Sequence, residues 1–293
     1  MFVQTNSIQS IREYFKNKLS SSFSDNEIKL IGNEVISLRL GLTKSDLIGS
    51  DEKLLSESDL LYFRSIVKRL MNNEPFQYIV GNAHFYGLEL KSDKRALIPR
   101  PETEELVDWV KTTFAQSDAE LRIADICTGS GCIALALKSL FQNSTIIASD
   151  ISNEALDLVR ENCEVTGLNV EVKNIDALDE VGYVNDFEFN TFDCWVSNPP
   201  YIPEEEKSKM AENVLEFEPH LALFVPNDNA LIFYKSISRL AAKYLKSGGF
   251  LFFEIHEDLS SEVVLLLEEF EFVEIEVKKD LQGRNRMVKA VKK

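Results

Sequence analysis

The segment Asn198-Pro199-Pro200-Tyr201 combines residue types that could hold a planar amino group. The Asn198 side-chain oxygen and the Pro199 backbone carbonyl can each accept one N–H of an NH₂ group. Two acceptors outside the plane of that group favour a pyramidal nitrogen, whose lone pair can then react. The prolines fix the backbone, and Tyr201 could stack on a planar substrate. The alternative for these four residues is an ordinary turn at a strand end.

A second candidate site is the glycine loop from Cys127 to Gly131, which stands between an apolar segment and an apolar helix. Its glycines allow a tight turn and a close approach to a ligand. Asp150, about twenty residues later, ends the next apolar segment, where an acid can accept both hydroxyls of a ribose. The third glycine of the dinucleotide fingerprint is absent. The Asp-x-x-x-Gly-x-Gly form that begins at Asp125 resembles the S-adenosylmethionine loop of Rossmann-like methyltransferases, and a tight turn of small residues is the alternative.

Apolar segments alternate with helical patterns in the second part of the chain. This order would position both the glycine loop with Asp150 and the segment from Asn198 to Tyr201. It predicts an α/β fold with a doubly wound, mostly parallel, Rossmann-like sheet, closed by an antiparallel C-terminal hairpin. Ligands of such sheets bind at the carboxyl ends of the strands, so the loop, Asp150 and Asn198 should lie together. The expected strands are 121–128, 144–151, 169–176, 192–200 and 248–255, and the hairpin is 271–280 with 285–293.

The first part of the chain predicts a small helical domain. Ser24 and Glu27 have capping-box spacing at the start of a helical pattern that stops at Gly41. A second pattern, from residue 56 onward, stops at Pro75. We therefore divide the chain into a helical domain (1–75) that docks the substrate, a β-hairpin connector (76–98) and a catalytic domain (99–293).

The composition narrows the classes of function. The 293 residues include 32 Lys and Arg against 48 Asp and Glu, which gives a net charge of −16. Such a surface repels a phosphate backbone, so we expect no direct binding of nucleic acid. The four cysteines form no C-x-x-C pair, which predicts neither a metal site nor a disulfide framework and fits a reducing cytoplasm. We expect no signal peptide and no membrane span, because the N-terminus is polar and no long apolar run occurs.

Several motifs resemble the HemK/PrmC family. They are Glu-Pro-Phe-Gln-Tyr-Ile-Val-Gly at 74–81, Phe-Tyr-Gly at 85–87 and Leu-Ile-Pro-Arg-Pro-Glu-Thr-Glu at 97–104, followed by 125–134, Asp150, 198–202, 217–223 and 280–286. The resemblance covers nearly the whole chain in order. It implies transfer of a methyl group from S-adenosyl-L-methionine to the side-chain amide nitrogen of the glutamine in the Gly-Gly-Gln motif of peptide chain release factors.

The resemblance also implies roles for individual residues. Two of them depart from the family pattern: Cys127 stands where glycine is frequent, and Ala177 where tryptophan is frequent. Another side chain would then have to cover the adenine of the cofactor. The implied cofactor-binding residues are Cys127, Thr128, Gly129, Ser130, Gly131, Asp150, Asp176, Ala177 and Asn198, and the implied substrate-binding and catalytic residues are Asn198, Pro199, Pro200 and Tyr201.

Three other functions compete with methylation of a release factor. Relatives that methylate a ribosomal-protein glutamine look different in the segment that matches 97–109. A DNA or RNA adenine methyltransferase would need a basic groove, which the net charge of −16 disfavours. A non-catalytic scaffold that only binds S-adenosylmethionine would have no use for an intact Asn-Pro-Pro-Tyr segment. For Glu254, at the end of the fifth strand, closure of the site and simple exposure to solvent both remain open.

Overall fold

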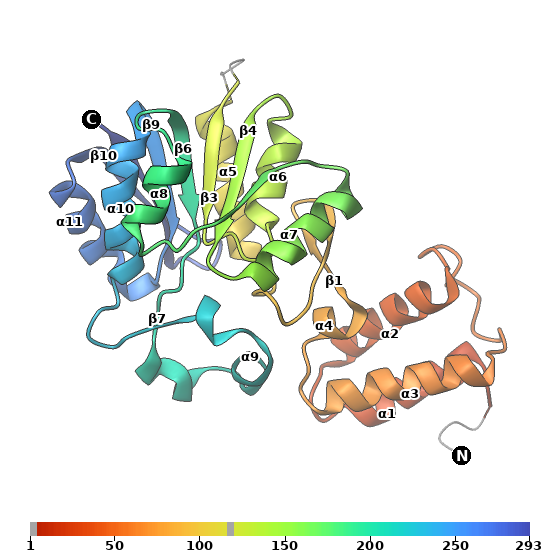
Figure 1. Cartoon of the computed structure of the whole chain (residues 1–293). Coiled ribbons are helices and arrows are strands. Elements are labelled where there is room, and N and C mark those ends of the chain that lie inside the picture. The colour runs from red at the N-terminus through yellow and green to blue at the C-terminus, as the bar shows by residue number, and fades with distance from the viewer. Residues whose placement is uncertain (1–4, 116–119) are drawn as a thin grey trace. The chain divides into compact units, whose positions relative to one another are not determined.

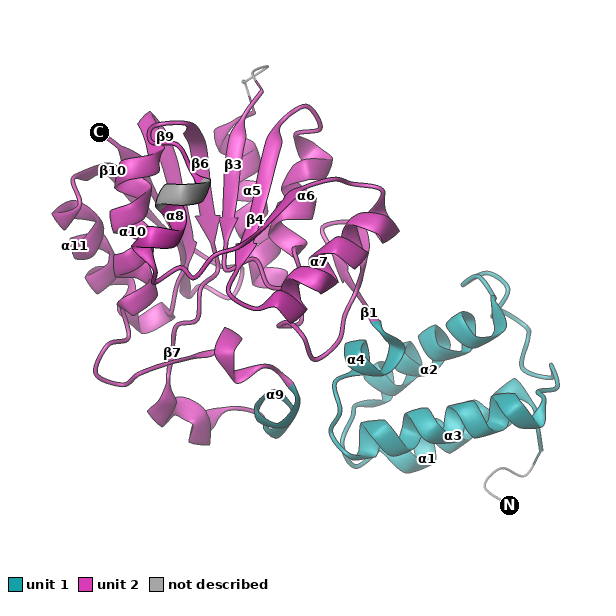
Figure 2. Cartoon of the chain, viewed as in Figure 1, with its two compact units in different colours: residues 1–81, 212–217 teal, residues 82–211, 218–293 magenta. Residues whose placement is uncertain are grey.

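The computed structural model describes residues 5–115 and 120–293, apart from the side chains of 184–186 (Figure 1). The chain divides into two compact units, residues 1–81 with 212–217 and residues 82–211 with 218–293 (Figure 2). Within the described ranges no helix has both the length and the apolar character needed to cross a membrane.

The first unit is helical, as the sequence predicted. Its helices are α1 (Ile8–Leu19), α2 (Asp25–Leu40), α3 (Glu57–Met71) and α4 (Phe76–Val80), and α9 (Glu212–Phe217) belongs to the same unit. Ser24 and Ser56 begin α2 and α3 with complete capping boxes. In each box the serine side chain accepts a backbone N–H of the first helical turn, and the side chain of Glu27 or Asp59 accepts the backbone N–H of the serine. The hydrophobic core of this unit is formed by side chains between Ile8 and Ile79.

Residues 76–80 correct one element of the prediction. They were expected to begin the β-hairpin, but they form helix α4, which ends at Gly81 in the left-handed conformation. Tyr78 and Ile79 of α4 are buried, so packing of these side chains overrides their preference for strands. The hairpin itself is shorter and consists of β1 (Asn82–Phe85) and β2 (Leu88–Lys91) in antiparallel register.

The second unit is built on the predicted sheet. Its strand order is β10-β11-β9-β6-β3-β4-β5, with β9, β6, β3, β4 and β5 parallel. The last strand is antiparallel to β9 and lies between β9 and β10, so β10 is the edge. The strands are β3 (Arg122–Ile126), β4 (Thr145–Asp150), β5 (Glu171–Asn174), β6 (Phe192–Ser197), β9 (Leu245–Glu254), β10 (Phe272–Lys279) and β11 (Asn285–Lys292).

Two hydrophobic clusters accompany this sheet. One contains side chains of α8 (Glu180–Asp186), α10 (Ile232–Tyr244) and α11 (Ser260–Glu269), and the other contains those of α5 (Pro101–Thr113), α6 (Cys132–Leu140) and α7 (Asn153–Thr166). Short elements connect β6 to α10: β7 (Ile202–Pro203), the 3₁₀ helix η1 (Glu204–Lys209), α9, η2 (His220–Ala222) and β8 (Phe224–Val225); η3 (Glu257–Leu259) precedes α11. The helices on both faces confirm the doubly wound α/β fold.

The register of the central strands brings their carboxyl ends together. Ile126 at the end of β3 pairs with Ser149 on one side and with Ser197 on the other. The residues that follow are Cys127, Asp150 and Asn198, which were predicted to lie at one site.

Candidate functional site

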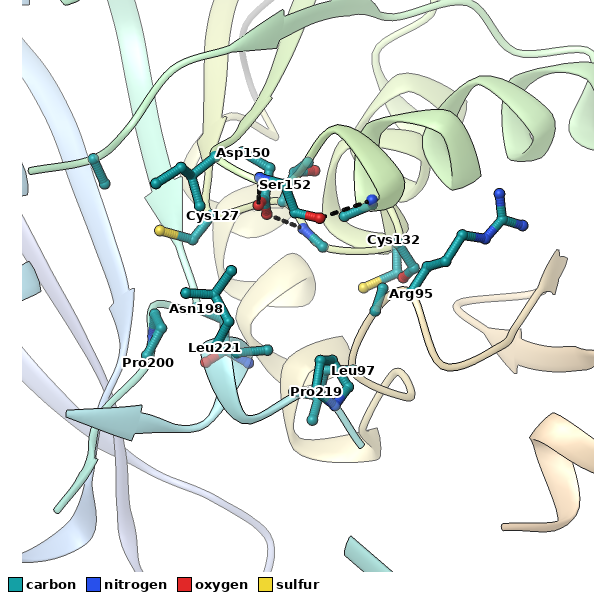
Figure 3. A pocket seen from close by; sticks show the side chains of 18 of the residues that line it. Arg95, Leu97, Cys127, Cys132, Asp150, Ser152, Asn198, Pro200, Pro219 and Leu221 are labelled. Carbon is teal, nitrogen blue, oxygen red and sulfur yellow. Dashed lines mark hydrogen bonds between the residues drawn. The ribbon is translucent and has the colours of Figure 1, made fainter. Parts of the chain in front are cut away.

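A cavity of about 330 Å³ lies at the carboxyl ends of these strands (Figure 3). This volume is within the usual range of small-molecule sites. The cavity brings together most of the predicted residues: Cys127, Thr128, Gly129, Ser130, Asp150, Asp176, Ala177, Asn198 and Pro200. Three predicted residues are not among the described residues that line the cavity. Gly131 caps α6, Pro199 is buried, and the Tyr201 hydroxyl donates to Glu254.

The glycine loop owes its shape to residues with positive φ. Gly129 and Gly131 have φ of +56° and +80°, and a Cβ on Gly131 would meet the Val159 side chain at 3.0 Å. Cys127 also has a positive φ, 60°, although it carries a side chain. The backbone at Cys127 is therefore strained where glycine would not be, which is a physical reason for the family's frequent glycine at this place.

Asp125 stabilises the loop from inside the protein. Its Oδ2 atom accepts the Thr128 hydroxyl at 2.5 Å and the Ala134 backbone N–H at 3.1 Å. Its Oδ1 atom has no hydrogen-bond partner among the described residues. Complete burial raises the pKa of this carboxyl to about 7, although the two hydrogen bonds act in the opposite direction.

Asp150 faces the same loop from the end of β4. One carboxylate oxygen accepts the Gly129 backbone N–H and the other accepts the Ser152 backbone N–H, both at 2.9 Å. Burial raises the pKa of Asp150, and these backbone hydrogen bonds oppose the rise. Asp150 also lines the cavity, where a carboxylate can accept hydroxyl groups from a ligand.

The apolar wall of the cavity includes a residue that the sequence did not reveal. Ala177 is buried, and its carbonyl accepts the Ser236 hydroxyl of α10 at 2.7 Å. This contact joins α10 to the segment after β5, and Phe233 of α10 lines the cavity with Ile175 and Leu178. Phe233 thus supplies an aromatic ring for a wall in which Ala177 replaces the family's tryptophan. One aromatic residue in an amphipathic helix gives no sequence signal for this role.

Asn198 is connected through Thr103, which also lines the cavity, to the buried acid Glu254. Its Nδ2 atom donates to the Thr103 hydroxyl at 3.3 Å, and that hydroxyl donates to Glu254 Oε2 at 2.6 Å. The Tyr201 hydroxyl donates to the other oxygen of Glu254 at 3.1 Å. Glu254 is only 2% exposed, so the exposed interpretation of this acid was wrong. The expected stacking surface of Tyr201 is not part of the cavity wall.

Two anchored segments complete the wall. Glu218 is buried and accepts the Ile98 backbone N–H at 3.1 Å and the Arg100 guanidinium at 2.5 Å, which attaches the segment after it to residues 98–100. Pro219 follows directly and lines the cavity, as Figure 3 shows. Arg100 of the motif at 97–104 and Glu218-Pro219 of the motif at 217–223 therefore have a structural explanation beside their sequence resemblance.

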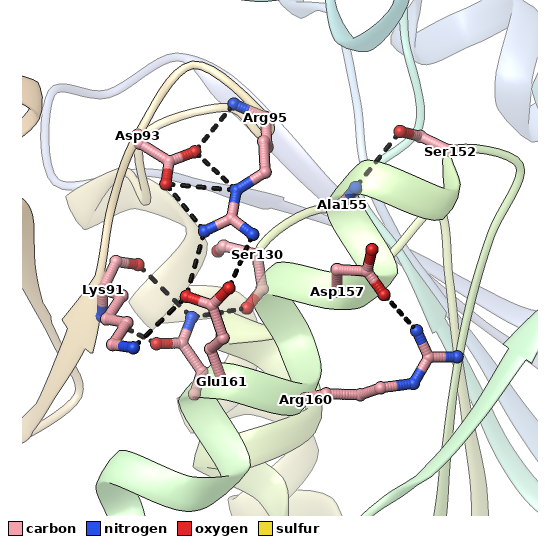
Figure 4. Close-up of polar contacts among 10 residues, drawn as sticks. Lys91, Asp93, Arg95, Ser130, Ser152, Ala155, Asp157, Arg160 and Glu161 are labelled. Carbon is pink, nitrogen blue, oxygen red and sulfur yellow. Dashed lines mark hydrogen bonds and ion pairs between the residues drawn. The ribbon is translucent and has the colours of Figure 1, made fainter.

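The other segment, 91–95, is fixed to α7 (Figure 4). Arg95 lines the cavity and forms ion pairs with Asp93 at 2.7 Å and Glu161 at 2.8 Å. The buried Asn162 side chain accepts the Lys91 backbone N–H at 2.6 Å and donates to the Ser130 carbonyl at 3.0 Å. Asn162 thereby ties the hairpin to the glycine loop.

The described part of the chain contains no group of three or more His, Cys, Asp or Glu side chains that could hold a metal ion. The polar groups of the cavity wall suit an organic ligand instead: they are backbone N–H groups, three acids (Asp150, Glu154 and Asp176) and the Asn198 amide, beside an apolar surface.

Comparisons with known proteins identify the family of the chain. Residues 16–81 match the PrmC N-terminal domain, and residues 104–220 match the methyltransferase small domain. The chain is 37% identical to the release factor glutamine methyltransferase of Flavobacterium psychrophilum over 96% of this chain and 98% of that protein. It is 39% identical to the protein of the same name from Streptococcus pneumoniae, over 92% of this chain and 97% of the relative.

Among solved structures, a 16S rRNA methyltransferase of T. thermophilus in complex with AdoMet and guanosine shares the fold. Its TM-score is 0.51 at 17% identity, and the match covers 72% of this chain and 50% of that chain. At this identity the likeness concerns the fold alone.

Proposed function

The chain belongs to the family of release factor glutamine methyltransferases, and we propose that it transfers a methyl group from S-adenosyl-L-methionine to the glutamine of the Gly-Gly-Gln motif in a peptide chain release factor. The acceptor atom is the side-chain amide nitrogen. The observation that carries the proposal is the place of Asn198, which lines the same cavity as the glycine loop and Asp150.

The cavity residues suit S-adenosylmethionine by their chemistry. Asp150 keeps acceptor capacity for the two ribose hydroxyls, and Phe233 with Ile175 offers an apolar surface for the adenine. Thr128, Gly129 and Ser130 would surround the amino-acid end of the cofactor, and Asp176 would face the adenine side. When bound, S-adenosylmethionine supplies an electrophilic methyl group on a sulfonium sulfur.

In this proposal Asn198 and Pro199 position the substrate amide. The lone pair of an amide nitrogen is delocalised, so the nitrogen is a weak nucleophile. The Asn198 Oδ1 atom and the Pro199 carbonyl each accept one N–H, which fixes the NH₂ group and favours pyramidalisation. Pro199 and Pro200 are buried and restrict the backbone that holds these acceptors. A strong base is not required, because the nitrogen becomes acidic as the new bond forms.

The domain assignment is also a proposal. We assign substrate docking to residues 1–75, the connection to 76–98 and the chemistry to 99–293, since the residues that line the cavity begin only at Lys94. The partner in this scheme is the release factor, a protein of translation, which places the enzyme in the cytoplasm. The net charge of −16 supports recognition of a protein rather than direct binding of nucleic acid.

An assay with labelled S-adenosylmethionine tests the function. The purified chain is incubated separately with a release factor, the same factor with its Gly-Gly-Gln glutamine changed to alanine, a ribosomal-protein mixture and DNA. We expect label only in the unaltered release factor. Label in the ribosomal proteins or DNA, or label in the altered factor, would replace this proposal with one of the competing functions.

A further inference from the structure

Four side chains form a continuous hydrogen-bonded chain that begins in the cavity wall with Asn198 and Thr103 and ends at Glu254 and Tyr201 outside it. The Asn198 Nδ2 atom donates to Thr103 Oγ1 at 3.3 Å, and Thr103 Oγ1 donates to Glu254 Oε2 at 2.6 Å. The Tyr201 hydroxyl donates to Glu254 Oε1 at 3.1 Å. These residues come from α5, from the end of β9 and from the segment after β6, so the chain connects three elements around the carboxyl end of β6.

The direction of the hydrogen bonds follows from counting hydrogens. A threonine hydroxyl has one hydrogen, and here it is donated to the Glu254 carboxylate. Its oxygen can then only accept, so the group of Asn198 that faces Thr103 has to be the NH₂ group and not the carbonyl oxygen. Without this constraint, an asparagine amide can rotate by half a turn at little steric cost, because its two ends have nearly the same shape.

The surroundings of Glu254 keep it an acceptor. It is 2% exposed, and both of its oxygens receive a hydroxyl hydrogen. Burial raises the pKa of Glu254, while the Thr103 hydroxyl, the positive charge of Arg286 and the Tyr201 hydroxyl act in the opposite direction. Arg286 is fixed by an ion pair with Asp280 at 3.2 Å.

We propose that Thr103 and Glu254 are positioning residues for methyl transfer: Glu254 takes the hydrogen of Thr103, Thr103 holds the NH₂ end of Asn198, and the Asn198 oxygen is left to accept an N–H of the substrate amide. The inference rests on the proposed function, since it assigns the acceptor role to Asn198. Glu254 at the end of β9 and Thr103 of the 97–104 motif then act together to orient Asn198.

Substitutions of Thr103 separate this role from simple packing. Thr103→Val keeps the shape but removes the acceptor, and Thr103→Ser keeps the hydroxyl but removes the methyl group. We expect Thr103→Val to lower kcat on release factor by about 10- to 100-fold, the size of effect known for partners that orient metal-binding side chains, with little change in S-adenosylmethionine affinity. Thr103→Ser should retain most activity. If Thr103→Ser is the more damaged variant, Thr103 serves packing and the proposal is wrong.

A double-mutant cycle tests whether Glu254 acts through Thr103. Glu254→Gln should lower kcat in the wild-type background, because a glutamine amide can donate as well as accept and no longer fixes the direction of the Thr103 hydroxyl. In the Thr103→Val background the same substitution should change kcat by less than about twofold, since the connection is already broken. Equal factors in both backgrounds would exclude transmission through Thr103.

A readout without turnover distinguishes failure of this inference from failure of the proposed function. The side-chain NH₂ signals of Asn198 can be assigned in NMR spectra by their loss in Asn198→Ala. They should shift and exchange faster with water in Thr103→Val but remain near the wild-type positions in Thr103→Ser. Unchanged signals in Thr103→Val would overturn the inference even if release factor is methylated. Wild-type protein that leaves release factor unmethylated would overturn the proposed function, while the NMR signals would still report whether Thr103 holds the Asn198 amide.

Discussion

The Asp150 carboxylate accepts the backbone N–H of Gly129 at 2.9 Å, so the acid that ends β4 and the loop that follows β3 are joined directly. The other carboxylate oxygen accepts the Ser152 N–H at the start of α7. Asp150 therefore organises the two backbone turns beside the cavity before any ligand binds. A ribose would meet a carboxylate that is already oriented, which reduces the entropy lost on binding.

The first prediction concerns this acid. Asp150→Ala should weaken S-adenosylmethionine binding by roughly 1.5–3 kcal/mol, the scale of hydrogen bonds to a charged group. Isothermal titration calorimetry gives the affinity directly. Asp157→Ala is the matched control, because Asp157 lies on α7, is exposed and pairs only with Arg160 among the bonds the structure shows. Equal affinities for Asp150→Ala and wild type would remove Asp150 from the cofactor site.

The second prediction uses the positive φ of Cys127. A left-handed backbone costs a residue with a Cβ about 1–2 kcal/mol, and a change to glycine removes this cost. Glycine also loses more chain entropy on folding, which cancels about 0.5–1 kcal/mol of that gain. Cys127→Gly should leave the free energy of unfolding within about 1 kcal/mol of wild type, whereas the β-branched Cys127→Val should destabilise the protein by more than that. Urea denaturation measures both values.

Cys194 provides the control for Cys127, because it is a buried residue inside strand β6. Glycine is unfavourable and valine favourable in a strand, so the order of stability should reverse: Cys194→Val should be more stable than Cys194→Gly. The same order at both cysteines would show that the backbone at Cys127 carries no strain.

The sequence predicted the sheet and its ligand-binding edge because both depend on local patterns. Apolar runs of strand length and the glycine loop located Asp150 and Asn198, since parallel strands must end at the same edge. Phe233 and the contact between Thr103 and Glu254 could not be found in this way. Phe233 and Thr103 reach the site through the packing of a helix on the sheet, which no local period reports.

The local patterns also had limits within the predicted elements. Residues 76–80 contain aromatic and β-branched side chains typical of strands, yet burial of Tyr78 and Ile79 in the helical unit selects a helix. Tyr201 has the residue type of a stacking platform, but its hydroxyl finds a buried carboxylate and the ring leaves the cavity wall. Contacts with residues distant in the sequence determine both the helix at 76–80 and the position of Tyr201.

The third prediction tests the docking role of the helical unit. Its hydrophobic core is formed entirely by side chains between Ile8 and Ile79, and the cavity is lined by residues from Lys94 onward. Deletion of residues 1–81 should therefore preserve S-adenosylmethionine affinity. It should lower kcat/KM for release factor at least about 10-fold, which corresponds to roughly 1.4 kcal/mol of lost binding. A truncated chain that methylates release factor at the full rate would show that docking lies elsewhere.

The fourth prediction concerns the amide of Asn198. Asn198→Ala should reduce the single-turnover rate by about 10²–10³, a range typical of losing one positioned polar group that acts in the transition state. Thermal stability should stay close to wild type, because the side chain lines the cavity and is only partly buried. Cofactor affinity should also change little, since the lost acceptor serves the substrate amide in the transition state. Asn143→Ala, at an exposed turn, is the control. An unchanged single-turnover rate would mean that the Asn-Pro-Pro-Tyr segment is only a strand-end turn.

The fifth prediction is a pH dependence of stability that originates at Asp125. Burial raises the pKa of this carboxyl to about 7 from an ordinary value of 3.8, so between these values the folded protein holds a proton that the unfolded chain releases. The folded state binds more protons, and its stability therefore falls as pH rises through this window, by at most about 1.4 kcal/mol per pH unit for one group. Above about pH 7 the fall ends, because both states are ionised.

Comparison of wild type with Asp125→Asn isolates this contribution. The introduced amide keeps an oxygen for the Thr128 hydroxyl and the Ala134 N–H but cannot ionise. The free energy of unfolding of wild type relative to the variant should decrease between about pH 5 and pH 7 in urea titrations. Asp59→Asn is the control: the Ser56 hydroxyl lowers the pKa of Asp59, so its contribution changes only below this window. A difference between wild type and Asp125→Asn that does not vary with pH would show that Asp125 is ionised in the folded protein throughout.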